Sequence, residues 1–186
     1  DRDITNSNII EVDENGIRVS DGSIVGGDIT NSADGVITAG ENGIWIDDSI
    51  VGGDLVNDGE ITSEGIEVPE PPSAMVTGDV SNPMVDYEDD TGIGIWVEDS
   101  TVAGSILNNE GATINAATDG ILVSYSSTVS GDIINNGTIN ATEDDGIDIT
   151  GSSAVVGDVI NNGTITVGQD AINLDGTSTI GGSIIN

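Results

Sequence analysis

Carboxylates are the residues of this chain with the most chemistry to offer, and several recur at a fixed interval. In a series of glycines that are 25 to 27 residues apart, five are followed by Asp: Asp28, Asp54, Asp79, Asp132 and Asp158. Other acidic residues stand in turns, among them Asp144 and Asp145. Because Ca²⁺ binds carboxylate oxygens, both sets are candidate Ca²⁺ ligands. A solvated acidic face without a bound cation explains the same pattern.

Residue types that are missing limit the possible enzyme chemistry. The chain has 34 Asp and Glu but no His, Cys or Lys. This excludes Ser-His-Asp and Cys-His nucleophiles and Schiff-base lysines. Paired carboxylates that hydrolyse a polysaccharide remain a further alternative. No pair stands out in the sequence, so we expect a protein that is not an enzyme.

The charge of the chain restricts its partners. Arg2 and Arg18 are the only cations, and the formal net charge is −32. Nucleic acids and anionic membrane surfaces bind through Lys and Arg, so neither is an expected partner. Small cations or basic partners fit better. No stretch approaches 18 apolar residues, so we expect no membrane contact by this segment.

The interval also organises the uncharged residues. Counted from the repeated glycine, an aliphatic residue stands two positions on and Asn stands four positions on. The Asn positions are Asn6, Asn31, Asn57, Asn82, Asn108, Asn135, Asn161 and Asn186. Stacked Asn side chains can pass amide hydrogen bonds from one repeat to the next. The spacing therefore predicts an Asn ladder, and we expect the repeated glycines to sit at sharp turns with positive φ.

Each repeat offers about three short β-segments and no helical periodicity. They surround the patterns "S-x-V", "D-I-x-N" and "G-I-x-V". Repeats of this length are too short for propeller blades. The sequence therefore predicts an all-β, single-stranded parallel β-solenoid with about seven coils of 25–27 residues. We expect residues 1–186 to form one domain, a segment of a longer rod.

Two features depart from the repeat. Trp45 and Trp96 fall in one outward-facing column, two predicted coils apart, with Glu67 between them. Exposed Trp can stack on sugars or anchor a protein, although a neighbouring loop could equally cover both rings. The prolines of the third coil predict an irregular stretch with a loop at 68–94. Pro71 and Tyr87 lie there and are candidate surface contacts.

The stretches "GDIINNGTI", "GIDITGSSAVVGDVINNGTI" and "GILVSYSSTVSGDIINNGTI" resemble passenger regions of Gram-negative autotransporters (type V secretion). The resemblance covers essentially the whole chain. It implies a right-handed β-helix on the bacterial cell surface, with export and anchoring segments outside this chain. It carries over no catalytic motif, because neither a "GDSGG"-like nor a "GDSL"-like sequence occurs.

Together these observations predict a non-catalytic extracellular β-helix that serves as a stalk or an adhesin. Its partner would be a glycan or a protein of a cell surface. The alternative is a subunit of an extracellular filament in which coils of successive molecules stack end to end, so that the partner is the chain itself.

Overall fold

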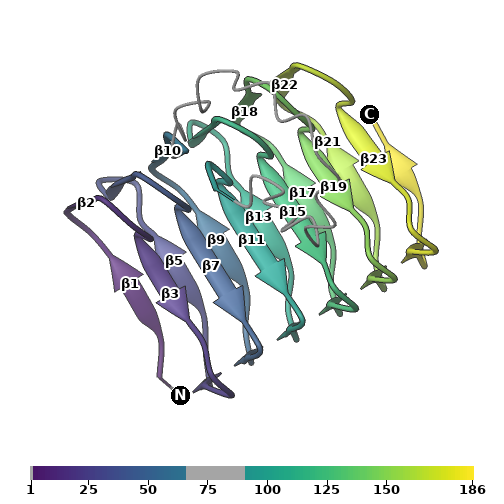
Figure 1. Cartoon of the computed structure of the whole chain (residues 1–186), viewed down its shortest axis with the longest axis horizontal. Helices are drawn as coiled ribbons and strands as arrows, with labels where there is room; N and C mark the ends of the chain where they lie inside the picture. The colour runs from purple at the N-terminus through teal and green to yellow at the C-terminus, as the bar shows by residue number, and fades with distance from the viewer. Residues whose placement is uncertain (1, 66–90) are drawn as a thin grey trace, which may run out of the picture.

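The computed structural model describes residues 2–65 and 91–186 and shows a parallel β-solenoid. The coils follow one another along the long axis, with the two termini at opposite ends (Figure 1). The described residues include no helix, and hence none that could cross a membrane. The predicted fold class is therefore confirmed.

Each full coil contributes one strand to each of four parallel sheets. Sheet A contains β1 (Ile4–Asn6), β5 (Ile29–Asn31), β9 (Leu55–Asn57), β13 (Ile106–Asn108), β17 (Ile133–Asn135), β21 (Val159–Asn161) and β25 (Ile184–Ile185). Sheet B contains β2 (Ile9–Val12), β6 (Val36–Ala39), β10 (Glu60–Ser63), β14 (Thr113–Ala116), β18 (Thr138–Ala141) and β22 (Thr164–Val167). Sheet C contains β3 (Ile17–Val19), β7 (Ile44–Asp47), β11 (Ile95–Glu98), β15 (Ile121–Ser124), β19 (Ile147–Ile149) and β23 (Ile172–Leu174). Sheet D contains β4 (Ile24–Val25), β8 (Ile50–Val51), β12 (Thr101–Val102), β16 (Thr128–Val129), β20 (Ala154–Val155) and β24 (Thr179–Ile180).

The prediction of three strands per coil was wrong, because each full coil also contributes a strand to sheet B. Its strands carry one large inward-facing aliphatic residue each, such as Ile61 in β10 and Ile114 in β14, which are buried. The second inward position holds a small residue, for example Ala39 or Ala116. A single large apolar residue per strand produces a weak alternation, so this segment resembled a turn in the sequence.

The described chain forms about six turns, where the sequence predicted seven. Strand β9 pairs directly with β13, and β7 pairs directly with β11. Gly65 and Gly92, near the two ends of the segment between them, lie side by side, since a Cβ on Gly92 would be 3.1 Å from the Cα of Gly65. The predicted loop at 68–94 lies outside the described residues except for residues 91–94.

Aliphatic columns fill the interior of the solenoid. Ile29, Ile44, Ile61 and their equivalents in the middle coils have no exposed surface. Burying one such side chain contributes about 1.5–3 kcal/mol. Because equivalent residues pair in register, for example Ile106 with Ile133, each column repeats the same contact from coil to coil. The apolar core therefore extends through the middle coils without interruption.

Seven Asn residues form a ladder beside this core, and its first five members are buried. The Nδ2 of Asn57 donates to Oδ1 of Asn108 at 2.9 Å and to the carbonyl of Thr113 at 3.2 Å. The same side-chain bond links the other members: Asn6 to Asn31, Asn31 to Asn57, Asn108 to Asn135, Asn135 to Asn161, and Asn161 to Asn186. Asn82 lies outside the described residues. A buried amide without such partners would cost about 1–3 kcal/mol.

Candidate functional site

The Asp residues that follow the repeated glycine bond one coil to the next. The Oδ1 atom of Asp28 accepts the backbone N–H of Asp54 at 2.9 Å. Asp54 accepts the N–H of Ser105 at 2.6 Å, and Asp132 accepts the N–H of Asp158 at 2.7 Å. In turn, Asp158 accepts the N–H of Ser183. One oxygen of each of these carboxylates is therefore committed to the protein backbone. Asp79 lies outside the described residues.

The same arrangement explains the glycine before each Asp. A Cβ added to Gly53 would lie 1.9 Å from Oδ1 of Asp28. For Gly157 the corresponding distance to Oδ1 of Asp132 is 2.0 Å. No repeated glycine of this set is among the described glycines with positive φ. The expectation of sharp turns was therefore wrong, and the glycine is required by the close approach of the Asp from the preceding coil.

The two Trp residues lie in adjacent coils. The predicted separation of two coils was therefore wrong. Trp45 pairs with Trp96, and their rings stack with centroids 5.2 Å apart. The guanidinium carbon of Arg18 lies 4.2 Å from the ring centroid of Trp45. Both faces of Trp45 are thus in contact with neighbours, Arg18 on one side and Trp96 on the other.

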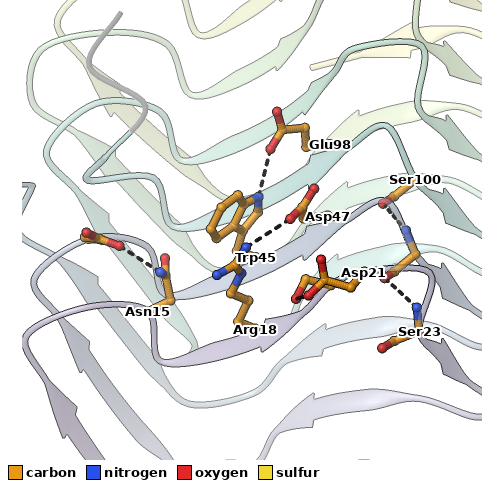
Figure 2. Close-up of polar contacts among 11 residues, drawn as sticks. Asn15, Arg18, Asp21, Ser23, Trp45, Asp47, Glu98 and Ser100 are labelled. Atoms are coloured by element: carbon orange, nitrogen blue, oxygen red, sulfur yellow. Dashed lines mark hydrogen bonds and ion pairs between the residues drawn. The ribbon is translucent and has the colours of Figure 1, made fainter. Parts of the chain in front are cut away.

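Polar contacts hold this stack on the outer side of sheet C. The indole N–H of Trp45 donates to Glu98 at 3.1 Å, and Arg18 forms an ion pair with Asp47 at 3.1 Å (Figure 2). Trp96 is only 3% exposed and donates to Ser124. Trp45 is the partly exposed ring of the two, and Arg18 beside it is exposed, so these two residues are the part of the stack that a partner could contact. Pro71 and Tyr87 lie outside the described residues.

An acidic pocket adjoins the Trp stack on the same side of sheet C. Leu122 packs against Trp96 and also lines a cavity of about 780 Å³. Asp148 follows Leu122 in the same outward column and lines the cavity as well. The remaining lining residues are Ile93, Thr118, Asp119, Ser124, Tyr125, Glu143, Asp144, Thr150, Gly151, Gln169 and Asp175. The pocket therefore combines carboxylates with an apolar and an aromatic wall.

Three carboxylates at this pocket could hold a metal ion. The ligand atoms of Asp119, Asp144 and Asp145 all lie within 4.8 Å of one another. Asp119 Oδ1 accepts the N–H of Asp145 at 3.0 Å, and Asp145 Oδ1 accepts the N–H of Asp170 at 2.7 Å. The structure thus brings the predicted residues Asp144 and Asp145 together with Asp119. It keeps them apart from the Asp28 column, which belongs to sheet A.

Asp119 and Asp148 were not among the predicted ligands. In the first two coils Asn15 and Asn42 fill the place of Asp119, and the N–H of Asn42 donates to Asn15 Oδ1. A change from Asn to Asp at an equivalent position was the available signal. Asp148 gave no signal, because its partner in the preceding coil is Leu122 and only the fold places it in the pocket.

The pocket holds more negative charge than its surroundings compensate. Burial raises the pKa of Asp119 to about 7, and the charges of Asp144, Asp148 and Asp145 add to this effect. Burial likewise raises the pKa of Asp148 to about 7, with Asp145, Asp175 and Asp144 contributing. The pKa of Asp144 is raised by burial and by Asp145. Oδ1 of Asp148 is buried and has no hydrogen-bond partner. A proton or a cation would relieve this repulsion.

The glycine requirement can be tested with two neighbouring substitutions. We expect Gly53→Ala to destabilise the protein by about 2 kcal/mol or more, since its Cβ would overlap Asp28 Oδ1 and approach the backbone of Gly27. The control is Gly26→Ala, whose Cβ would have its nearest neighbour, the backbone N of Arg2, at 3.9 Å. Urea unfolding measures both. Equal losses would show that the close approach is not the cause.

The raised pKa values predict a pH dependence of stability. Between about pH 4 and pH 7 the folded protein keeps protons on Asp119 and Asp148 that the unfolded chain releases. Stability should therefore be greatest at the acid end of this range and fall, by an amount on the order of a few kcal/mol, as the pH rises to about 7.

The variant Asp119→Asn isolates this effect. It retains a side-chain oxygen for the N–H of Asp145, as Asn15 does for Asn42. We expect a flatter stability profile and a higher melting temperature at pH 8 than in the unmodified protein. Asp132→Asn removes one charge from another column and serves as the control for general repulsion. Identical profiles for the two variants would contradict the assignment.

Comparison with protein-family models, with curated proteins and with solved structures found no match. The site therefore has to be interpreted from its own geometry. Two features stand out on the outer side of sheet C: the Arg18–Trp45–Trp96 stack and the acidic pocket beside it.

Proposed function

We propose that this chain is a non-catalytic extracellular rod that acts as a stalk or an adhesin on the bacterial surface. The observation that carries the proposal is that the repeated polar residues form hydrogen bonds between successive coils. The Asn ladder and the Asp column bond each coil to the next, as does a column of Ser residues. In the Ser column the N–H of Ser49 donates to Oγ of Ser100, and the N–H of Ser100 donates to Oγ of Ser127. Residues committed in this way build length and rigidity.

The geometry suits a spacer. Coils in register are about 4.8 Å apart, so six turns extend about 29 Å. Each coil contacts only its neighbours, and stability then grows with the number of coils. Adding coils lengthens such a rod without a new kind of interaction. Support for the location outside the cell comes from the resemblance of the quoted repeats to autotransporter passenger regions.

The outer side of sheet C is the best-supported contact surface for an adhesin. The rim of Trp45, the exposed ring of Tyr125 and the carboxylates of the pocket lie on this side. Aromatic rings and carboxylates together suit a glycan, which offers apolar ring faces and hydroxyl groups, or a protein segment of mixed polarity.

The location can be tested in the organism that encodes the chain. Antibodies raised against the purified chain should label intact cells, and an external protease should remove the label. An antibody against a cytoplasmic protein provides the control for intact envelopes. Labelling that requires permeabilised cells would contradict the proposal of surface display.

A filament subunit remains the second candidate, and the identical register of successive coils favours it. Every sheet repeats the same pairing, for example Ile4 with Ile29 and Ile29 with Leu55, so the bonding pattern sets no length. Negative-stain electron microscopy distinguishes the candidates. Short rods of the length of one chain would support the stalk, and long fibres of uniform width would support the filament.

The acidic pocket carries the Ca²⁺ proposal. Three carboxylates within 4.8 Å match the oxygen ligands that Ca²⁺ prefers, and the cation would offset the negative charge that helps to raise the pKa values of Asp119 and Asp144. We expect Ca²⁺ at pH 8 to raise the melting temperature by several degrees. Asp119→Asn with Asp144→Asn should abolish this shift, whereas Asp132→Asn with Asp158→Asn should keep it. A shift that depends on the second pair would place the ion on the Asp column instead.

The same pocket is where a carboxylate-dependent polysaccharide enzyme would have its site. It provides a cavity and a carboxyl group with a raised pKa, as a general acid requires. The single variant Asp119→Asn tests for this catalytic role. Turnover of a polysaccharide that Asp119→Asn alone abolishes would favour the enzyme over the non-catalytic rod.

A further inference from the structure

An aliphatic stripe runs along the outer face of sheet A. Its members are the second residues of five successive strands: Val56, Leu107, Ile134, Ile160 and Ile185. The strands pair in register, so each of these residues lies directly over the next. Four are partly exposed, and Ile185 is 46% exposed. Four intervals of about 4.8 Å give the stripe a length of about 19 Å.

The stripe is a feature of the later coils and not of the repeat itself. In the first two coils the same column holds Thr5 and Thr30. Thr5 pairs with Thr30, and Thr30 pairs with Val56. Thr is therefore compatible with the outer face, and nothing in the coil stacking demands an aliphatic residue. Strands of parallel sheets that carry aliphatic residues on both faces are typically covered on both faces.

Acidic and amide side chains border the stripe. Residues alternate in direction along a strand, so the outward neighbours of Ile134 are Asp132 and Asn136. Asp54, Asp132 and Asp158 line one border, and each commits Oδ1 to a backbone N–H. On the other border Asn109 donates to Asp58, and Asn162 donates to Asn136. The two cations of the chain, Arg2 and Arg18, both precede β5.

We propose that this stripe, Val56 to Ile185, is the docking surface for a cationic amphipathic helix of a partner protein. The apolar side of the helix would cover the stripe, and its Lys or Arg residues would meet the second oxygens of Asp54, Asp132 and Asp158. The inference rests on the fold and on charge complementarity, and it is independent of where the rod is displayed.

Spacing and charge favour this occupant over others. One helical turn advances 5.4 Å, close to the coil spacing of about 4.8 Å, and about 13 residues would cover 19 Å. In an extended strand, residues on one side are about 6.6 Å apart, a poorer match. A second copy of the chain laid sideways against the stripe, unlike one stacked end to end, would bring its charge of −32 against the acidic border and would be repelled.

The experiment uses three synthetic peptides of about 14 residues and measures binding by fluorescence anisotropy. The first contains Leu and Lys in an amphipathic helical order, the second has the same composition in scrambled order, and the third replaces Lys by Glu. The full chain should bind the first peptide most tightly. Leu107→Thr with Ile134→Thr should weaken that binding by about tenfold or more, because two apolar contacts are lost.

The matched control is Ile24→Thr with Ile50→Thr, which makes the same chemical change on exposed residues of sheet D. It should alter binding by less than about twofold. A second stripe variant, Val56→Thr with Ile160→Thr, covers the case in which the first does not fold, as judged by circular dichroism. Equal binding by stripe and control variants would overturn the proposal. A dimer, detected by light scattering, that the stripe variants abolish would also overturn it in favour of self-association.

Discussion

Stacking in register is the constraint on which the rest of this structure depends. Parallel pairing places each residue directly over its equivalent in the preceding coil, at about 4.8 Å. A side chain must therefore fit against a copy of itself, as Ile106 does with Ile133. The Gly-Asp pair shows the consequence for the backbone. Because Oδ1 of Asp28 occupies the space where a Cβ of residue 53 would lie, the Asp of one coil requires the glycine of the next. The glycine recurs because a polar side chain of the preceding coil occupies this space, Asp28 at Gly53 and Ser105 at Gly131.

The same constraint stacks like charges, and the chain handles them in two ways. In the Asp column each carboxylate accepts a backbone N–H, so a charged acceptor meets a fixed dipole of the neighbouring coil. In the pocket, Asp119 and Asp145 also accept backbone N–H groups, but Asp144, Asp148 and Asp175 add charge nearby. Burial is what separates the two sites, since it removes the water that would screen the added charges. Repulsion between carboxylates is therefore stronger in the pocket than in the Asp column.

Much of the fold could be predicted, because in a solenoid the residues that are one repeat apart in the sequence stack in one column of the structure. The aliphatic, Asn and Gly positions needed only their spacing to be placed. Strand pairing was harder: "GIEV" at Gly65 fits the repeat as well as "GIWV" at Gly94, and only the structure shows that Ile44 pairs with Ile95. That choice brings Trp45 and Trp96 into contact. The pocket could not be predicted, because its walls come from several coils and each member looks like an ordinary turn or strand residue.

Positions that vary between coils deserve a different interpretation from those that repeat. A repeated residue such as Asn108 is explained by its hydrogen bonds to its equivalents in the neighbouring coils, and no other role is needed to account for it. A residue that departs from its column is not required by stacking. Leu107 stands where Thr30 stands in an earlier coil, and Asp119 stands where Asn42 does. The Trp stack, the acidic pocket and the aliphatic stripe all lie where a column changes its residue type from the earlier to the later coils. Recognition by this rod is therefore best sought where equivalent coils differ, since those are the positions that the fold itself leaves open.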